Sequence, residues 1–227
     1  MTSATIPGDI ADAIQARRSV RGFLPQAIPP QTLEAIFSLA QAAPSNCNVQ
    51  PWRVYVASGD KCVALRDSFM AQAAAGTAPA PDFGDLPVFE GEHRSRQVAC
   101  AAALYGAMGI ERDDKFGRLG ALLRNFELFD APHVAFIGMP RSYGVANALD
   151  VGIYLQTLLL AMTHYGVASC AQLSLSYYPD LVRDAFGIAP DMGILVGISF
   201  GYEDTTVAAN NTRCGREELG QLVTFAE

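Results

Sequence analysis

The stretch Arg17-Arg18-Ser19-Val20-Arg21 places three guanidinium groups within five residues of a chain whose net charge is -7. If the backbone is extended here, alternate side chains share a face, and Arg17, Ser19 and Arg21 point the same way. Two forked cations and a hydroxyl group form a suitable cradle for a phosphate dianion. The alternative is a solvated basic end of a helix, because cations favour helix C-termini. The segment alone leaves both interpretations open, because short motifs often match by chance.

The composition of the 227-residue chain excludes several classes of protein. Half of its residues are hydrophobic and 17% are charged, which is typical of a globular protein with a sizeable core. The acidic balance argues against nucleic acid or an anionic membrane surface as a partner, because both are bound through an excess of basic residues. The length allows one sizeable core or at most two small ones. Because the sequence has no internal repeat and no low-complexity linker, we expect one domain over residues 1–227.

The cysteines and the apolar segments indicate the cellular compartment. The five cysteines are widely spaced without a CxxC pair, and the three histidines lack metal-ligand spacing, so neither disulfides nor a metal site is expected. Residues Met1–Ala16 do not have the pattern of a signal peptide. The apolar stretch Val151–Met162 is too short and too interrupted to span a bilayer. These features predict a soluble, cytoplasmic protein.

Hydrophobic periodicity predicts helices that alternate with a few strands. Pro30 suits the first position of a helix, and Pro44 is expected to end that helix. The only tryptophan, Trp52, is expected in the core. This pattern favours a layered α+β domain. The other predicted helices cover about residues 9–16, 61–74, 95–110, 118–128 and 147–165, and the predicted strands cover 52–56, 133–139 and 193–200.

Three separated motifs resemble those of the nitroreductase family. The first is Arg17–Phe23, and the second is Ala43–Trp52, which contains Pro-Ser followed by Asn-x-Gln-Pro-Trp. The third is Asn211-Thr212-Arg213, followed by Glu217 and Leu219. Their order and spacing fit the family over almost the whole chain, and together they are far more specific than any one of them.

The resemblance implies a fold, a cofactor and a reaction. The fold has three layers, with a central, mostly antiparallel sheet between helices and a C-terminal tail exchanged between the subunits of a homodimer. FMN would lie at the dimer interface, and NADH or NADPH would supply electrons. A nitroaromatic or related small oxidised aromatic compound would be reduced by ping-pong hydride transfer. No catalytic side chain is expected, since the flavin N5 atom carries the chemistry.

The resemblance also implies which residues hold the FMN phosphate. Arg17, Ser19 and Arg213 would bind it directly, and Arg18 would help through its main chain or side chain. Arg21 would lie nearer the pyrimidine edge of the flavin, where a fixed cation stabilises the reduced state.

Other residues are expected at the flavin ring. Pro44 and Ser45 would contact the ring system from the partner subunit. Asn48 would bond the cofactor or the main chain, and a turn residue that bonds its own backbone is an equal alternative. One main-chain N–H would face N5, donated by Ala171, Gln172 or Leu173.

The substrate is the least determined part of this interpretation. Thr77–Glu90 has the length of a lid, although a plain surface excursion is an equal alternative. The region at about residues 71–129 would select the substrate. The same scaffold also suits a reductive dehalogenase, an enone reductase, a flavin-cleaving enzyme or a dehydrogenase of peptide-derived rings. The non-enzyme alternative is a flavin-binding sensor or storage protein.

One further motif would indicate a hydrolase. Gly197-Ile198-Ser199-Phe200-Gly201 spells the GxSxG of α/β-hydrolases. That motif requires a helix after the serine and a histidine later in the chain, whereas the last histidine here is His164. A buried strand is therefore the favoured interpretation of this segment.

Overall fold

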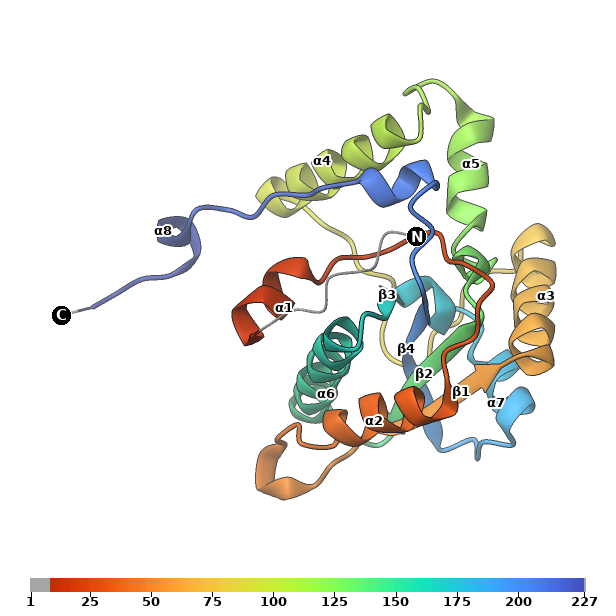
Figure 1. Ribbon diagram of the computed structural model, residues 1–227, viewed down its shortest axis with the longest axis vertical. Helices are drawn as coiled ribbons and strands as arrows, with labels where there is room; N and C mark the ends of the chain where they lie inside the picture. Colours follow the sequence, from red (N-terminus) through yellow and green to blue (C-terminus); the bar gives the residue numbers. More distant parts are fainter. Residues whose placement is uncertain (1–8, 227) are drawn as a thin grey trace.

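A four-stranded antiparallel sheet runs through the middle of the protein, in the order β1-β2-β4-β3 (Figure 1). Its strands are β1 (Arg53–Ser58), β2 (His133–Pro140), β3 (Ala168–Gln172) and β4 (Met192–Gly201). The structure, a computed structural model, describes residues 9–226. All three neighbouring pairs of strands are antiparallel, which confirms the predicted sheet. The first eight residues of the segment in which no signal peptide was expected lie outside the described residues.

Helices cover both faces of this sheet, which gives the expected three layers. Side chains alternate along β2, so that Ala135 and Ile137 pack on one face and Val134 and Phe136 on the other. On the first face lie α2 (Pro30–Ala40) and α6 (Val145–His164), and on the second lie α3 (Asp60–Ala74) and α7 (Pro179–Phe186) (Figure 1). The α+β fold is therefore confirmed.

Helix α2, which precedes the second motif in the chain, starts where the sequence predicts. Pro30 occupies the first turn of α2, where its missing N–H costs nothing. The helix ends at Ala40, four residues before the predicted breaker Pro44, and its end continues into tight turns such as Ala43 N to Ala40 O at 3.1 Å. The chain then leads through the short 3-10 helix η1 (Asn46–Asn48) into β1.

The two helices of the predicted lid differ from the prediction at their ends. The helix expected over 95–110 is α4 (Gly91–Ala107), and the one expected over 118–128 is α5 (Lys115–Leu123). After Leu123 the chain forms turns over residues 124–127, and positive φ angles of 55°, 54° and 64° at Leu128, Phe129 and Asp130 exclude an α-helix at the end of the predicted range. These residues form the short helix η2 (Leu128–Asp130), in which the Phe129 side chain is buried and its carbonyl accepts from Phe23 N.

The longest helix, α6, is a core helix. It has 20 residues, and by length and composition it could cross a membrane. The apolar stretch Val151–Met162, which was predicted to be too short for this, is part of this longer helix. Its packing decides the matter, because Val151, Tyr154 and Leu158 are buried in the main core. Trp52 stacks on Tyr154 with ring centroids 4.7 Å apart, which confirms its predicted core position.

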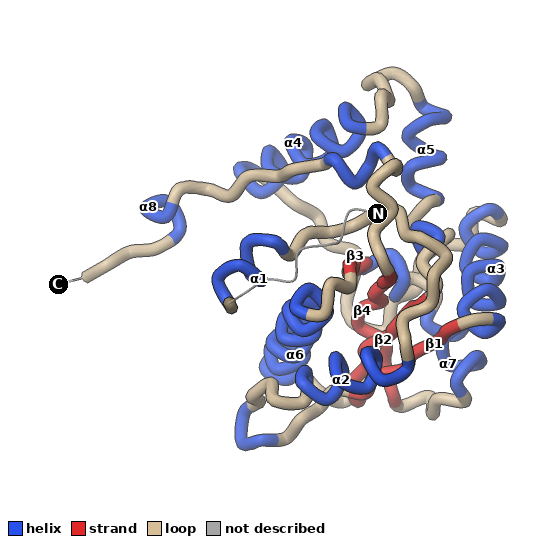
Figure 2. The backbone as a smooth tube through the Cα atoms, viewed as in Figure 1, coloured by secondary structure: helices blue, strands red, loops and turns tan. Residues whose placement is uncertain are grey.

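The C-terminal tail, residues 212–226, leaves the body of the molecule (Figures 1 and 2). It follows η4 (Ala208–Asn211), which packs against α4, and it contains only the short helix α8 (Leu219–Leu222). Its apolar side chains are exposed in the described part of the chain, with Leu222 at 61% and Phe225 at 79%. Such a tail is suited to docking on a second surface.

Candidate functional site

The basic segment, residues 17–21, runs along the outer edge of β3. It follows α1 (Ile10–Ala16), whose N-cap Asp9 accepts a hydrogen bond from Asp12 N at 2.9 Å. Beyond α1 the chain is extended: Ser19 forms a parallel bridge with Ser169, and Val20 N donates to Ser169 O at 3.0 Å. The extended interpretation is therefore correct, and the solvated helix end is not.

The alternate side chains of the basic segment gather around the buried thiol of Cys170. Burial raises the pKa of this thiol, whereas the Arg21 charge, a hydrogen bond from Ser19 and the Arg17 charge act in the opposite direction. Two guanidinium groups and a hydroxyl group thus lie near one another beside β3. This is the cradle geometry that an extended chain predicts.

A buried amide, that of Asn210, joins the basic segment to the other end of the chain. Its Oδ1 accepts from Arg21 N at 2.6 Å, and its Nδ2 donates to Gly22 O at 3.0 Å and to Asp204 O at 2.8 Å. Gly22 is needed in this close contact, because a Cβ there would lie 2.6 Å from Val207. Sequence reasoning missed Asn210, although it directly precedes the third motif.

The main-chain oxygen of Asn210 brings two arginines together. It accepts from Arg18 Nη1 at 3.0 Å and from Arg213 Nη1 at 2.9 Å. Arg18 also forms an ion pair with Glu203, so its side chain is engaged within the protein. The first and third motifs, almost 200 residues apart, therefore meet as the sequence predicts.

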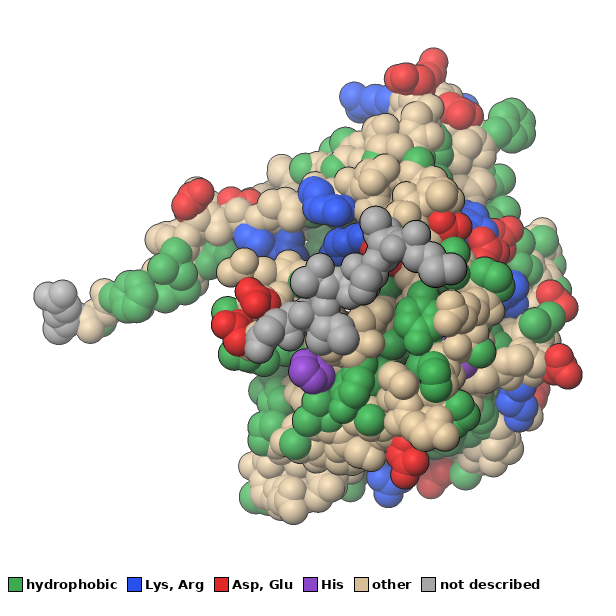
Figure 3. Space-filling model, viewed as in Figure 1, with side chains coloured by type: hydrophobic (Ala, Val, Ile, Leu, Met, Phe, Trp, Pro, Cys, Tyr) green, Lys and Arg blue, Asp and Glu red, His purple; other side chains and the backbone are tan. Residues whose placement is uncertain are grey.

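The remaining cations of the cluster are not neutralised. Among residues 9–226, no carboxylate forms an ion pair with Arg17, Arg21 or Arg213. In the described part of the chain, the Arg21 guanidinium donates only to Ser19 O, at 3.3 Å, and that of Arg213 donates only to two main-chain oxygens. Figure 3 shows basic side chains gathered beside the start of the tail. These donors fit a phosphomonoester in charge and in hydrogen-bonding capacity.

The free edge of β3 passes beside this cluster. Because Ser169 O faces the basic segment, strand alternation turns the main chain of Ala171 to the same edge and that of Gln172 toward β4. The Gln172 side chain is buried, accepts from Ser199 Oγ at 2.5 Å and donates to Asn125 O at 2.9 Å. Leu173 begins the short helix η3 (Leu173–Ser176).

The loop of the second motif, residues 44–50, has an unusual backbone. Three of its non-glycine residues have positive φ angles: Cys47 at 48°, Asn48 at 56° and Gln50 at 44°. Ser45 Oγ accepts from Gln50 N at 2.9 Å and holds the loop in this shape. Among residues 9–226, the Asn48 side chain has no hydrogen-bond partner, so it does not bond its own backbone. Strain of this kind persists mainly where function requires it.

Within one chain, this loop does not reach the basic segment. Asn46 N donates to Asp150 Oδ1 at 2.9 Å, which places the loop at the N-terminal half of α6. The basic segment lies beside β3, which follows the other end of α6 (Figure 1). Asp150 and His164 are about four helical turns apart, or roughly 20 Å. Pro44, Ser45 and Asn48 are therefore not brought to the arginine cluster by the fold of a single chain.

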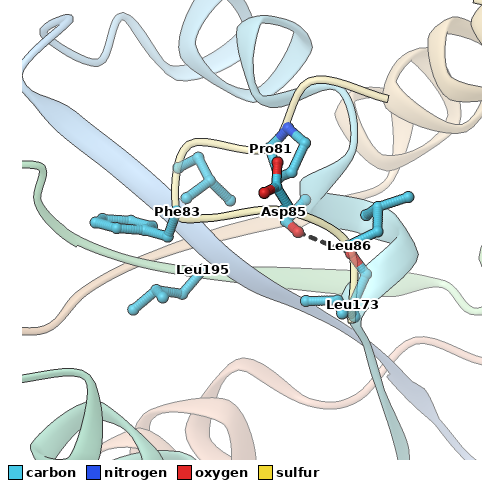
Figure 4. Close-up of a pocket in the computed structure, with 8 residues that line it drawn as sticks. Pro81, Phe83, Asp85, Leu86, Leu173 and Leu195 are labelled. Carbon is cyan, nitrogen blue, oxygen red and sulfur yellow. Dashed lines mark hydrogen bonds between the residues drawn. The ribbon is translucent and has the colours of Figure 1, made fainter. Parts of the chain in front are cut away.

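A small pocket lies under the loop Thr77–Glu90 (Figure 4). Its volume is about 70 Å³, well below the roughly 300 Å³ at which ligand pockets begin. The Ser176 hydroxyl donates to Leu173 O at 2.8 Å within it. The pocket is too small for a flavin. It is lined by Pro81, Phe83, Asp85, Leu86, Leu173, Ser176, Ile194 and Leu195.

The GxSxG segment is a strand, as predicted. Ser199 lies inside β4, is fully buried and is paired with Val134 of β2 and Cys170 of β3. Among residues 9–226, no group of three His, Cys, Asp or Glu side chains is placed to hold a metal ion. His133, one of the three histidines, is buried in the core at 2% exposed.

Comparison with known proteins agrees with this architecture. Residues 14–202 match the Nitroreductase family. The chain is 40% identical over 226 residues to Nitroreductase NfnB of Mycolicibacterium smegmatis, covering 96% of this chain and 94% of the relative. It is 34% identical over 242 residues to the 4-nitrobenzoate reductase of Nocardioides sp., covering 98% and 97%.

A solved structure gives the same result in three dimensions. The crystal structure of the FMN-dependent nitroreductase NfnB from Mycobacterium smegmatis in complex with NADPH superimposes with a TM-score of 0.91. The two sequences are 39% identical, and the match covers 96% of this chain and 100% of the other. Fold, motifs and sequence identity agree along nearly the whole length, and the chain therefore belongs to the nitroreductase family.

Proposed function

We propose that this protein is a homodimeric enzyme that reduces nitroaromatic compounds with electrons from NADPH or NADH. The chain is an FMN-dependent NAD(P)H oxidoreductase of the nitroreductase family. The observation that carries the proposal is the convergence of three un-neutralised guanidinium groups, those of Arg17, Arg21 and Arg213, beside the free edge of β3.

The phosphate of FMN is assigned to Arg17, Ser19 and Arg213. Their donors have no carboxylate partner among residues 9–226, so a dianion could bind there without breaking an ion pair of that part of the chain. Arg18 has a different role from these residues, because Glu203 and the Asn210 carbonyl already engage its side chain. It fixes the basic segment in place, and only its main chain is available to the phosphate.

The ring of FMN is assigned to the outer edge of β3. FMN supplies a hydride acceptor and donor at N5 when it is bound. Of the three main-chain donors that the sequence left open, we favour Ala171, because its N–H faces the free edge while that of Gln172 faces β4. Arg21 is assigned to the pyrimidine edge. We expect ping-pong kinetics, since NAD(P)H and the oxidised substrate would occupy the same place in turn.

A second subunit would complete the site with Pro44, Ser45 and Asn48. The loop that carries them has a strained backbone, and among residues 9–226 the Asn48 side chain has no hydrogen-bond partner. The loop also lies far from the arginine cluster of the same chain. The outward side of α6 supports a dimer as well, because Val145, Leu149 and Ile153 are 88%, 68% and 36% exposed and follow one another at helical spacing. The apolar tail would dock on the partner in exchange for the partner's tail.

The substrate class follows from the relatives. Proteins 31% identical to this chain include a chloronitrobenzene nitroreductase and a nitrobenzene nitroreductase. A nitroarene is therefore the favoured substrate, and the region at about residues 71–129 would select among nitroarenes. All five cysteines are free thiols, which fits the reducing cytoplasm where NAD(P)H is supplied.

The test begins with the visible spectrum of the purified protein. We expect a yellow protein that releases about one FMN per chain on denaturation, a stoichiometry that one phosphate cradle per chain requires. Oxidation of NADPH and of NADH should be followed with 4-nitrobenzoate, with an iodinated phenol and with an enone. A colourless protein whose melting temperature FMN does not raise would contradict the proposal. Steady turnover with nitroarenes excludes the storage or sensor alternative.

A further inference from the structure

Two cysteines from distant parts of the chain meet on the surface. Cys100 lies in α4, and Cys214 lies in the tail, 114 residues later. Their Sγ atoms are 3.2 Å apart, and both residues are exposed. Sulfur atoms at this distance are in direct contact and need to approach by little more than 1 Å to reach the bond length of about 2.05 Å.

The thiol contact belongs to a longer contact between the tail and α4. Arg96 lies one helical turn before Cys100, on the same face of the helix. Its Nε donates to Glu217 Oε1 at 2.9 Å, and its Nη2 lies 3.2 Å from Glu92. The tail therefore follows one face of α4 at two successive points, as its course across α4 in Figure 1 shows.

The surroundings of Cys100 raise its pKa. Burial contributes most, followed by the neighbouring Cys214, and the charges of Arg21 and Arg216 act against this rise. The case for chemistry at this thiol therefore rests on its contact with a second sulfur atom and on the exposure of both.

The other three cysteines are not placed for this chemistry. Cys62 and Cys170 are buried, so an oxidant in solution does not reach them. Cys47 is exposed, but among residues 9–226 no second thiol contacts it. The pair on α4 and the tail is the one thiol–thiol contact in the described part of the chain.

We propose that Cys100 and Cys214 are a redox modification site that forms a reversible disulfide between α4 and the tail of the same chain. Hydrogen peroxide is the oxidant. The thiolate of one cysteine attacks the peroxide, the O–O bond breaks, and a sulfenic acid and one water form. The second thiol then attacks that sulfur and displaces a second water. The two thiols lose two electrons and two protons in total, and a dithiol reductant restores both.

The disulfide fixes the residue after Arg213 to α4. While the bond lasts, the tail cannot leave that helix, and residues 214 and 217 stay aligned with residues 100 and 96. The pairing itself does not depend on the proposed nitroreductase activity, because it rests only on the geometry of the thiols.

The sequence allows a direct test by peptide mapping. Trypsin places each cysteine on a separate peptide: Cys100 on residues 97–112 and Cys214 on residues 214–216. The full-length protein as purified is reduced, desalted, treated with one equivalent of hydrogen peroxide per chain, blocked with N-ethylmaleimide and digested without reductant. We expect a linked peptide pair lighter by two hydrogen atoms than its parts, which dithiothreitol separates again.

Single substitutions provide the controls. Cys100→Ser and Cys214→Ser should each abolish the linked pair, whereas Cys47→Ser, which removes a lone exposed thiol, should leave it unchanged. Non-reducing electrophoresis should show the oxidised protein at the mass of a single chain. Alkylation of both thiols after oxidation, separate over-oxidation of each, or the linked pair in a band of twice the chain mass would overturn the proposal.

Discussion

The Arg21 guanidinium is the cation that we assign to the pyrimidine edge of the flavin. Within residues 9–226 its guanidinium donates to Ser19 O and to no other group, so its charge is available to a ligand. Arg21→Ala should lower the reduction potential of bound FMN and slow reduction by NADPH by about tenfold or more, because a preorganised charge is lost. A dye-equilibrated redox titration and stopped-flow reduction measure both effects.

Arg94→Ala is the matched control for this experiment, since Arg94 is exposed and its side chain bonds only Gln97. It should change neither the potential nor the rate. An unchanged potential in Arg21→Ala would show that the cation lies elsewhere in the site.

His133 makes stability depend on pH. Its Nε2 accepts from Ile28 N at 2.9 Å, so its proton is on Nδ1, which lies 2.5 Å from Ser58 Oγ. Burial lowers the pKa of His133 below its ordinary value of 6.5, because the charged imidazolium loses its hydration. Below about pH 6.5 the unfolded chain therefore binds more protons than the folded one.

It follows that the free energy of unfolding should fall as the pH falls from about 6.5 through the lower pKa of the folded state. Urea denaturation at a series of pH values measures this slope. His133→Phe should be less stable at pH 8 by about 1–3 kcal/mol, because Ile28 N loses its acceptor, and its slope should be smaller. His164→Phe, at an exposed position, should keep the wild-type slope.

The loop Thr77–Glu90 is anchored to the body of the protein through Asp82. The Asp82 carboxylate is 1% exposed and bonds Arg141 Nη2 at 2.6 Å, Arg183 Nη1 at 2.7 Å and Ile194 N at 2.8 Å. Asp82→Asn should lower the free energy of unfolding by about 3 kcal/mol, because the partly buried Arg183 loses its counter-charge while the half-exposed Arg141 is rehydrated. Chemical denaturation measures the loss.

Asp85→Asn, three residues further along the same loop, is the control and should change stability by less than about 0.5 kcal/mol, because Asp85 is exposed. Equal losses in the two variants would show that loop composition, and not the Asp82 contacts, is responsible.

The positions of helices and strands were predicted more accurately where the local sequence pattern determines them than where long-range contacts do. The buried strands at 133–139 and 193–200 and the start of α2 at Pro30 are set by periodicity and by proline geometry, and all are confirmed. The end of α5 could not be predicted, since the positive φ angles at Leu128–Asp130 depend on burying Phe129 against Phe23. Such contacts join residues about 100 positions apart.

The same distinction holds for the site. The extended basic segment and the approach of Arg213 follow from the motifs. The motifs do not predict the contacts of Asn210, of Asp82 or of the two neighbouring thiols. Each of these contacts joins residues that are far apart in the sequence and that only folding brings together. The division of the site between two ends of α6 also needed the structure, although the resemblance already placed Pro44 and Ser45 on the partner.

At the scale of the whole molecule, the outward apolar side of α6 is the surface that we assign to the dimer. Leu149→Asp puts a charge in the middle of it and should give monomers that lose FMN, because the loop of residues 44–50 would no longer reach the cofactor of a partner. Analytical ultracentrifugation and flavin absorbance after gel filtration measure both results.

Val63→Asp is the comparison for this variant, since Val63 is an exposed apolar residue of α3 on the other side of the sheet. It should remain a dimer with full flavin content. A Leu149→Asp protein that stays dimeric and yellow would place the interface on another surface.

The bonds that Asn210 makes have a consequence for protein synthesis. A ribosome delivers the arginines near the start of the chain long before the residue that holds their backbone in position, because Asn210 lies 189 positions after Arg21. Until that asparagine leaves the exit tunnel, the nascent polypeptide has the cations of a flavin site but not their arrangement. Loading of the cofactor is therefore a late event, which follows synthesis of the chain from Arg21 through Asn210.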